Sequence, residues 1–173
     1  TGMTDGAKVV AFVRYCAKEL RLDHIFVDNM AKCVEDEDDY SGQKRFINTM
    51  CAIAADYGVH IHVVHHLKKP AKETDKPDKS DVKGSGSIID QPDNLMLVWR
   101  NKPKEEARKE GRAGKGNEPD AMVYCKKQRN YEGNEDNEPS ISLWMDKQSL
   151  QFLGSPEDKP IDLMNFPHKR NPY

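Results

Sequence analysis

The sequence has no long apolar run, no signal-peptide pattern and no paired cysteine motif. No stretch approaches the roughly 18 apolar residues that a membrane-spanning helix needs. The opening residues lack the charged and apolar regions of a secretory signal, and 1–4 resemble a cut point more than a natural start. These absences predict a protein without a membrane segment, and its 173 residues suit one domain with one core.

Cysteines are few, and they are scattered: Cys16, Cys33, Cys51 and Cys125. Three of them lie in apolar segments with periodic spacing, which is typical of buried thiols rather than of disulfides or zinc ligands. The sequence therefore predicts a reducing compartment, and the expected location is the cytoplasm.

An excess of charge of either sign is also missing, because the formal net charge is only -2. This balance excludes a protein that coats nucleic acid through bulk positive charge. The charges are nevertheless uneven, since 35–39 is acidic whereas 68–83 and 102–115 are rich in lysine and arginine. Any contact with a polyanion is therefore expected in loops, which suits a groove or a pore better than a basic face.

Four segments in the first part of the sequence alternate between helical and strand patterns. Apolar residues recur at helical spacing in 5–22 and in 46–57, which Gly58 ends. Short apolar runs in 24–28 and 59–66 predict two buried strands. This alternation of helix and strand implies right-handed crossovers and a parallel sheet.

The remaining sequence predicts further strands, separated by two irregular charged stretches. A long polar loop is expected at 67–86, and a charged stretch without periodicity at 101–119. The predicted strands are 94–99, 121–127, 141–145 and 150–153, with antiparallel pairing at the edge of the sheet. We therefore expect one domain over 1–153, followed over 154–173 by a tail rich in proline and charge that has no core.

Asp28 is the first residue that suits chemistry. An acid at the C-terminal end of a central parallel strand lies in the crevice where α/β sheets bind ligands. In nucleotide hydrolases such an acid holds a magnesium ion through water. The alternative interpretation, a helix-capping or surface aspartate, stays open from these residues alone.

Four histidines gather in and after the second predicted strand: His60, His62, His65 and His66. Their spacing resembles the zinc-binding pattern of metallo-β-lactamases, so a zinc-dependent hydrolase is one hypothesis. That pattern needs an aspartate where this sequence has Val64. The other hypothesis is that His60 and His62 are ordinary strand residues on one face, while His66 donates a hydrogen bond to a γ-phosphate.

Two further motifs suit contacts with phosphate groups. Glycines in Lys83–Ser87 let the backbone approach a phosphate closely, although such a motif is also common in turns. Lys127 and Arg129 are separated by one residue on a predicted strand, so they point to the same side and can reach one anionic target together. Cations in solvent are the alternative interpretation of this pair.

In this order, the segments resemble the replicative hexameric DNA helicase family, which includes DnaB-type helicases, phage primase-helicases and the mitochondrial Twinkle helicase. The similarity runs from about Thr4 to Leu153. It depends on five short motifs: Ile25–Asp28, Val63–Pro70, Lys83–Ile88 with Asp93, Leu97–Arg100 and Lys127–Asn130. Their order and spacing together are typical of the family.

The resemblance implies a role for each motif. Asp28 would close the Walker B strand and hold magnesium, and His66 would sense the γ-phosphate of ATP. Arg100 would pack near the adenine, whereas Lys127 and Arg129 would reach the nucleotide of the neighbouring subunit. The residues implied in DNA binding are Lys68, Lys69, Lys83, Gly84 and Ser85.

The same resemblance implies a fold and a function. The fold is α/β, a RecA-like and mostly parallel sheet flanked by helices, with antiparallel strands at the C-terminal edge. The function is part of an ATP-dependent ring-shaped DNA helicase, which translocates on single-stranded DNA and unwinds duplex during replication. ATP and Mg²⁺ are the implied cofactors. Single-stranded DNA and further copies of the chain, in a hexamer, are the implied partners, with primase as another candidate.

Three features depart from the family pattern. No G-x-x-x-x-G-K-[ST] phosphate loop occurs in the 173 residues, so we expect a partial ATPase domain that is inactive alone. The glutamine after the family's DNA loop falls at Asp90, beside Gln91. The aromatic residue that packs on the base falls at Met145, beside Trp144. A non-catalytic nucleic-acid-binding remnant therefore stays open beside the zinc-dependent hydrolase.

Overall fold

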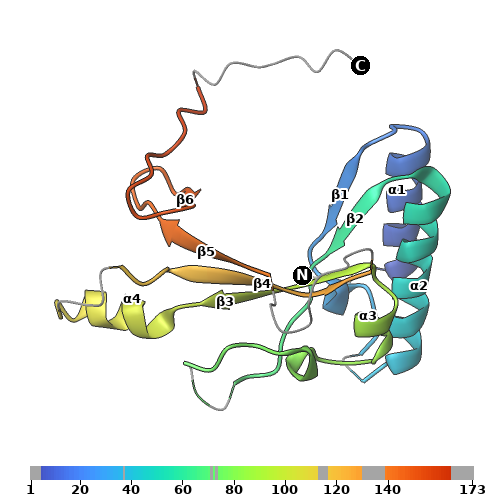
Figure 1. The fold of residues 1–173 in the computed structure, drawn as a ribbon. Coiled ribbons are helices and arrows are strands. Elements are labelled where there is room, and N and C mark those ends of the chain that lie inside the picture. The colour runs from blue at the N-terminus through green and yellow to red at the C-terminus, as the bar shows by residue number, and fades with distance from the viewer. Residues whose placement is uncertain are drawn as a thin grey trace. The chain divides into compact units, whose positions relative to one another are not determined.

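The computed structural model describes residues 5–36, 38–70, 72, 74–112, 117–129 and 139–164, and it divides the chain into two compact units (Figure 1). The first unit comprises Thr1–Ala71, Pro77–Leu95 and Lys126–Glu132. The second unit comprises Lys72–Lys76, Met96–Cys125 and Gly133–Tyr173.

The first unit is built on a parallel strand pair covered by two helices. Strands β1 (His24–Val27) and β2 (His60–Val63) pair in parallel with His24 opposite His60. Helices α1 (Gly6–Lys18) and α2 (Tyr40–Tyr57) pack against each other and against the strands (Figure 1). The predicted order of helix, strand, helix and strand, and the parallel pairing, are confirmed.

Local signals in the sequence set the bounds of these helices. Asp5 caps α1 by accepting a hydrogen bond from the Ala7 amide at 2.9 Å. Asp39 caps α2 by accepting a hydrogen bond from the Gly42 amide, so this helix begins at Tyr40, before the helical pattern predicted over 46–57. Gly58 ends α2 with φ at 63°, a left-handed conformation that glycine adopts without steric cost.

The core of the first unit lies between the helices and one face of the strand pair. Met30 and Ile53 are fully buried there, together with Ile25 and Val27 of β1. Phe26 alternates with them and is 71% exposed on the other face. The predicted buried strand is therefore buried on one face only, because alternate residues of β1 reach the helices.

The predicted polar loop 67–86 contains regular structure. An isolated antiparallel bridge joins Leu67 to Val82, and a short 3-10 helix, Lys79–Asp81, lies between them. Another 3-10 turn, Met30–Lys32, follows β1, and the four-residue helix α3 (Ser87–Asp90) follows the loop. The described residues of 67–86 otherwise form the predicted loop, and backbone hydrogen bonds bring its two ends together.

The other strands form a separate four-stranded sheet in the order β3-β4-β5-β6. Their bounds are β3 Asn94–Arg100, β4 Ala121–Gln128, β5 Ser140–Met145 and β6 Phe152–Leu153. β4 with β5 and β5 with β6 are antiparallel, as predicted for the C-terminal edge. Among the described residues the six strands thus make two sheets, where the sequence predicted one.

Helix α4 (Lys102–Lys109) lies in the stretch predicted to be irregular. The Asn101 side chain caps it by accepting a hydrogen bond from the Lys104 amide at 3.1 Å, and Pro103 lies in its first turn. The helix has almost no apolar residues, so hydrophobic periodicity gave no sign of it. Within the described residues, no helix combines the length and the apolar character needed to cross a membrane.

The start of the predicted tail is held to the second unit. The Gln151 side chain makes two hydrogen bonds to the Ile161 backbone, at 2.8 Å and 3.0 Å. Residues 154–164 contain neither helix nor strand. The rest of the predicted tail, from 165 to 173, lies outside the described residues.

A buried ionic cluster centred on Asp120 organises the second unit. Asp120 is 8% exposed, and its carboxylate lies 3.1 Å from Lys104 Nζ and 3.2 Å from Arg108. It also accepts a hydrogen bond from the Met145 amide at 3.0 Å, while Lys104 Nζ donates to the Glu118 carbonyl. Burial raises the pKa of Asp120, but these hydrogen bonds and positive charges outweigh burial and hold the pKa below its usual value.

We expect Asp120→Ala to lower the free energy of unfolding by about 3–5 kcal/mol at neutral pH, because it leaves Lys104 buried without its carboxylate. Urea denaturation would measure the loss, with Glu106→Ala, an exposed change on α4, as the control. The stability that Asp120 contributes is present above its unfolded pKa of about 3.9 and is lost as the pH falls through the lower folded value. Equal effects of the two substitutions at pH 7 would contradict this assignment.

Candidate functional site

The carboxyl ends of β1 and β2 bring two predicted site residues close together. Asp28 directly follows β1 and is exposed. Its neighbour Asn29 donates a hydrogen bond from Nδ2 to His66 Nε2 at 3.1 Å. The backbone bond from Met30 N to Val64 O, at 3.0 Å, holds the two segments together. β2 ends at Val63, so His66 lies three residues beyond the strand. The predicted position of His66, at the end of a strand over 59–66, is therefore wrong.

The oxygen atoms at this edge suit a magnesium ion. Asn29 Oδ1 is buried and has no hydrogen-bond partner among the residues described. The Asp28 carboxylate lies beside it in the sequence and is open to solvent. Carboxylate and amide oxygens are the groups that bind Mg²⁺ or its water ligands. These residues therefore fit the ion that the sequence predicts.

The predicted DNA-binding loop is bonded directly to the histidine segment. His65 Nε2 donates to the Lys83 carbonyl at 2.8 Å, and the Lys83 amide donates to the His66 carbonyl at 3.3 Å. On the other side of the loop, the Ser85 amide donates to Oε1 of Gln43, a side chain of α2 that is 2% exposed. A displacement of the His65–His66 segment would thus act on the loop through one side-chain and one backbone hydrogen bond to Lys83.

A pocket of about 250 Å³ lies between these groups. Its lining includes His66, Lys68, Lys83 and Gly84, so it joins the predicted phosphate sensor to three predicted DNA-binding residues. Two of the remaining lining groups are Gln43 and Asp38. Lys68 holds its place by donating from Nζ to the Ser80 carbonyl at 2.8 Å.

Gly84 is the position in this loop that depends most on glycine. Its φ is 89°, and an added Cβ would lie 2.3 Å from Gln43 Oε1, the atom that accepts the Ser85 hydrogen bond. At Gly86 the nearest atom to an added Cβ is 3.7 Å away, which is ordinary contact.

We therefore expect Gly84→Ala to destabilise the fold by about 1–2 kcal/mol, and Gly86→Ala by less than about 0.5 kcal/mol. The difference should appear in urea denaturation, and Gly84→Ala should also weaken binding of single-stranded DNA by the intact protein. If both variants behave alike, the Gln43 contact does not fix this loop.

Lys127 and Arg129 point to the same side, as predicted, and reach one segment of their own chain. Lys127 Nζ donates to the carbonyls of Ile89 at 3.0 Å and Asp90 at 2.6 Å. Arg129 pairs with the Asp93 carboxylate at 2.9 Å, and it donates to the Gln91 carbonyl at 3.2 Å. Both cations are thus held by 89–93, which directly follows the predicted DNA loop. Asn130 of the same motif lies outside the described residues.

Arg100 belongs to the second unit, where it pairs with a side chain that the sequence did not single out. Its guanidinium donates to both carboxylate oxygens of Glu105, at 2.5 Å and 2.6 Å. This fork-to-carboxylate pairing lowers the pKa of Glu105 and raises that of Arg100. A contact between Arg100 and adenine stays a prediction.

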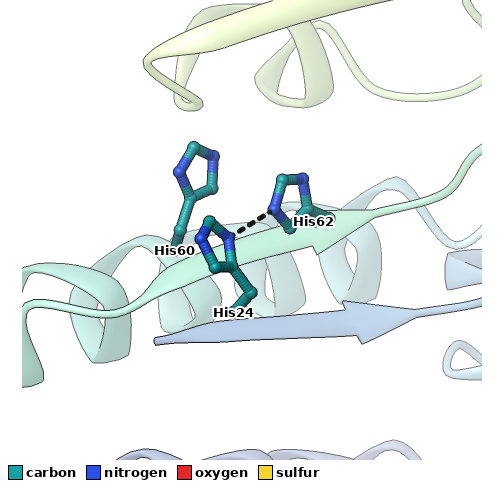
Figure 2. A group of neighbouring side chains, drawn as sticks. All are labelled: His24, His60 and His62. Atoms are coloured by element: carbon teal, nitrogen blue, oxygen red, sulfur yellow. Dashed lines mark hydrogen bonds between the residues drawn. The ribbon is translucent and has the colours of Figure 1, made fainter. Parts of the chain in front are cut away.

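The predicted cluster of four histidines does not assemble. His65 and His66 bond instead to the Lys83 carbonyl and to Asn29. His60 and His62 do share one face of β2, as the alternative interpretation predicted, and His24 of β1 joins them (Figure 2). No sequence pattern pointed to His24, because its contact with His62, 38 residues away, depends on the register of β1 and β2.

Two comparisons identify the family of this chain. Residues 2–150 match the family described as DnaB-like helicase C terminal domain. The structure is similar to a solved one described as "The Structure Of A DnaB-Like Replicative Helicase And Its Interactions With Primase", with a TM-score of 0.64 and 13% sequence identity. This similarity covers 87% of the present chain but only 35% of that chain, and no curated protein matches.

The similarity to this solved structure confirms the predicted fold of the present chain, which is a partial RecA-like α/β domain. The family match spans all of the residues that carry the five predicted motifs. The chain belongs to the DnaB-like helicase C-terminal domain family.

Proposed function

We propose that this chain is the part of a ring-shaped replicative DNA helicase that connects ATP hydrolysis to movement along single-stranded DNA. The observation that carries the proposal is the pair of hydrogen bonds between Lys83 and the His65–His66 segment. In this proposal they link the segment that carries the phosphate-sensing His66 directly to the DNA-binding loop at Lys83. The chain spans 35% of the length of the solved relative, so the activity of a whole helicase is part of this proposal.

In this proposal ATP and Mg²⁺ bind at the carboxyl ends of β1 and β2. Asp28 holds the ion, which when bound neutralises negative charge on the phosphates. His66 accepts from Asn29 through Nε2, so in the neutral ring Nδ1 carries the proton and can donate to a γ-phosphate oxygen. Loss of that phosphate removes the acceptor, which allows His66 and the attached loop to shift.

Lys127 and Arg129 are the residues that we propose reach a neighbouring subunit. Their present partners include backbone carbonyls and one exposed carboxylate, Asp93. A triphosphate carries more negative charge than Asp93 and presents several oxygens, so it competes well for both cations. Exchange between Asp93 and the neighbour's phosphates would couple each nucleotide to the segment 89–93 after the DNA loop.

Other features of the proposal rest on the family alone. They are a hexameric ring, single-stranded DNA and primase as partners, a phage-type replication system, a cytoplasmic location and packing of Arg100 on adenine. None of the four cysteines forms a disulfide, which suits a reducing compartment. The 173 residues contain no phosphate loop, and we propose that this chain alone does not turn over ATP. Steady turnover by the purified chain, lost in Asp28→Asn, would contradict that statement.

Nothing among the described residues favours a zinc-dependent hydrolase, since the four histidines of that hypothesis are divided between two places. A non-catalytic DNA-binding remnant is the second candidate. It predicts DNA binding that ATP does not affect, whereas the proposed motor predicts a dependence on the bound nucleotide.

In the intact protein we expect Lys83→Ala to weaken binding of single-stranded DNA about equally for all sequences. Because one phosphate contact is lost, the salt dependence of binding should also become shallower by about one unit of the logarithmic slope. Fluorescence anisotropy at several salt concentrations would measure both effects. Lys8→Ala, which removes the same charge from an exposed position of α1, is the control. A loss restricted to one DNA sequence would indicate base recognition and contradict the assignment.

A further inference from the structure

We propose that His24, His60 and His62 form a binding site for a divalent transition metal, with Zn²⁺ the best-suited ion, on the exposed face of the β1–β2 pair (Figure 2). One nitrogen from each side chain lies within 4.8 Å of the others. This set differs from the four histidines suggested by sequence spacing, and it involves no hydrolytic role.

Strand pairing explains why three histidines meet at this place. His24 lies directly opposite His60 in the parallel register, and His62 is two residues further along β2. Residues two apart on a strand share a face, and directly opposite residues on neighbouring strands do as well. Ile25, the next residue after His24 on β1, is buried against the helices. The histidines therefore occupy the other face of the strand pair.

The distances approach those of a tetrahedral metal site. His24 Nδ1 and His62 Nε2 are 3.2 Å apart. Two nitrogens that bind one zinc ion tetrahedrally at about 2.0–2.1 Å lie roughly 3.3 Å from each other. His60 completes the set after a side-chain rotation, because its ring now stacks on His62 with centroids 4.3 Å apart. Water would fill the fourth position.

The surroundings orient the His62 ring. Phe26 stacks on His62 with a centroid distance of 4.2 Å and an interplanar angle of 6°, which fixes the ring. The ring is also partly buried beside the imidazoles of His60 and His24, which lie on the same face. Imidazole ligands suit Zn²⁺, Ni²⁺ and Cu²⁺, rather than the Mg²⁺ expected at Asp28.

This site is separate from the nucleotide site. His24 begins β1 whereas Asp28 follows its end, so their Cα atoms are about 13 Å apart along the strand. A metal bound to both strands would fix the register of β1 and β2 from the end opposite to Asp28 and His66. We therefore assign it a structural role that does not depend on the proposed helicase activity.

Titration of the metal-free, purified chain with Co²⁺ and then Zn²⁺ tests the proposal. We expect one equivalent of Co²⁺ to give the visible absorption of a tetrahedral nitrogen site, and Zn²⁺ to displace it. His24→Gln, His60→Asn and His62→Gln should each weaken Zn²⁺ binding at least about tenfold, because even residues that only support a ligand contribute that much. His60→Cys, which retains a zinc ligand, should keep the affinity within about tenfold and show that lost binding is not lost folding.

His66→Gln is the matched control, because it removes a histidine of the same segment from outside the cluster. Its affinity for Zn²⁺ should equal that of the unchanged chain. The proposal is overturned if the unchanged chain fails to bind Zn²⁺, as when another surface covers this face. It is equally overturned if the three cluster variants bind normally, or if His66→Gln loses as much affinity as they do.

Discussion

Asp28→Asn in the intact protein is expected to lower DNA-stimulated ATP turnover about a thousandfold. The substitution keeps the size of the side chain but removes the negative charge that we propose holds Mg²⁺ beside the phosphates. Stabilisation of charge by a bound metal contributes several kcal/mol to a transition state, and each 1.36 kcal/mol corresponds to a tenfold change in rate. Steady-state phosphate release with saturating single-stranded DNA would measure the effect.

Asp23→Asn provides the control for this experiment. Asp23 is exposed and directly precedes β1, so the substitution removes one carboxylate from the other end of the same strand. Turnover by this variant should stay within about twofold of the unchanged protein, as is usual for a surface change. If Asp28→Asn retained normal turnover, the carboxyl end of β1 would not be the metal site.

Arg129→Ala is expected to lower DNA-stimulated turnover by at least about a thousandfold, while the affinity for nucleotide changes less than about tenfold. An arginine supplied to a neighbour's phosphates acts chiefly on the transition state, and such residues contribute roughly a thousandfold or more in related phosphoryl transfers. Arg129→Lys should restore only part of the rate, because lysine lacks the planar fork of donors. Nucleotide binding and turnover must be measured separately.

Two further variants distinguish this role from a structural one. Arg112→Ala removes an exposed arginine of the second unit and should leave turnover unchanged. Asp93→Ala removes the present partner of Arg129, at 2.9 Å, and should leave the arginine able to act. A loss of turnover in Asp93→Ala as large as in Arg129→Ala would mean that the ion pair itself is what matters.

Much of the fold could be predicted because its signals are local. Helical periodicity, the short apolar runs and Gly58 specified two helices and a parallel strand pair. The alternation of β1 was harder to predict, since Phe26 is apolar yet 71% exposed. Helix α4 was missed because its stability comes from Asn101 and from the buried Asp120 cluster, neither of which gives hydrophobic periodicity.

The candidate site was predicted in its chemistry but not in its connections. Asp28 and His66 stood out as polar residues near strand ends, and both lie at the carboxyl edge of the parallel pair. Their links to the rest of the site depend on tertiary contacts. Ser85 bonds to Gln43 across 42 residues, and Lys127 bonds to Ile89 across 38. No pattern within either segment reveals such partners.

The proposal that Arg129 acts on the nucleotide of a neighbouring subunit is tested most directly by mixing two inactive forms of the intact protein, Asp28→Asn and Arg129→Ala. The quantity to measure is DNA-stimulated ATP turnover. In a ring whose sites lie between subunits, each site takes Asp28 from one subunit and Arg129 from the next. Random mixing in equal amounts therefore gives intact sites at about a quarter of the interfaces, and we predict turnover far above either parent. If the mixed rings form, as verified by differently tagged subunits, and remain as inactive as both parents, Arg129 does not act across the interface.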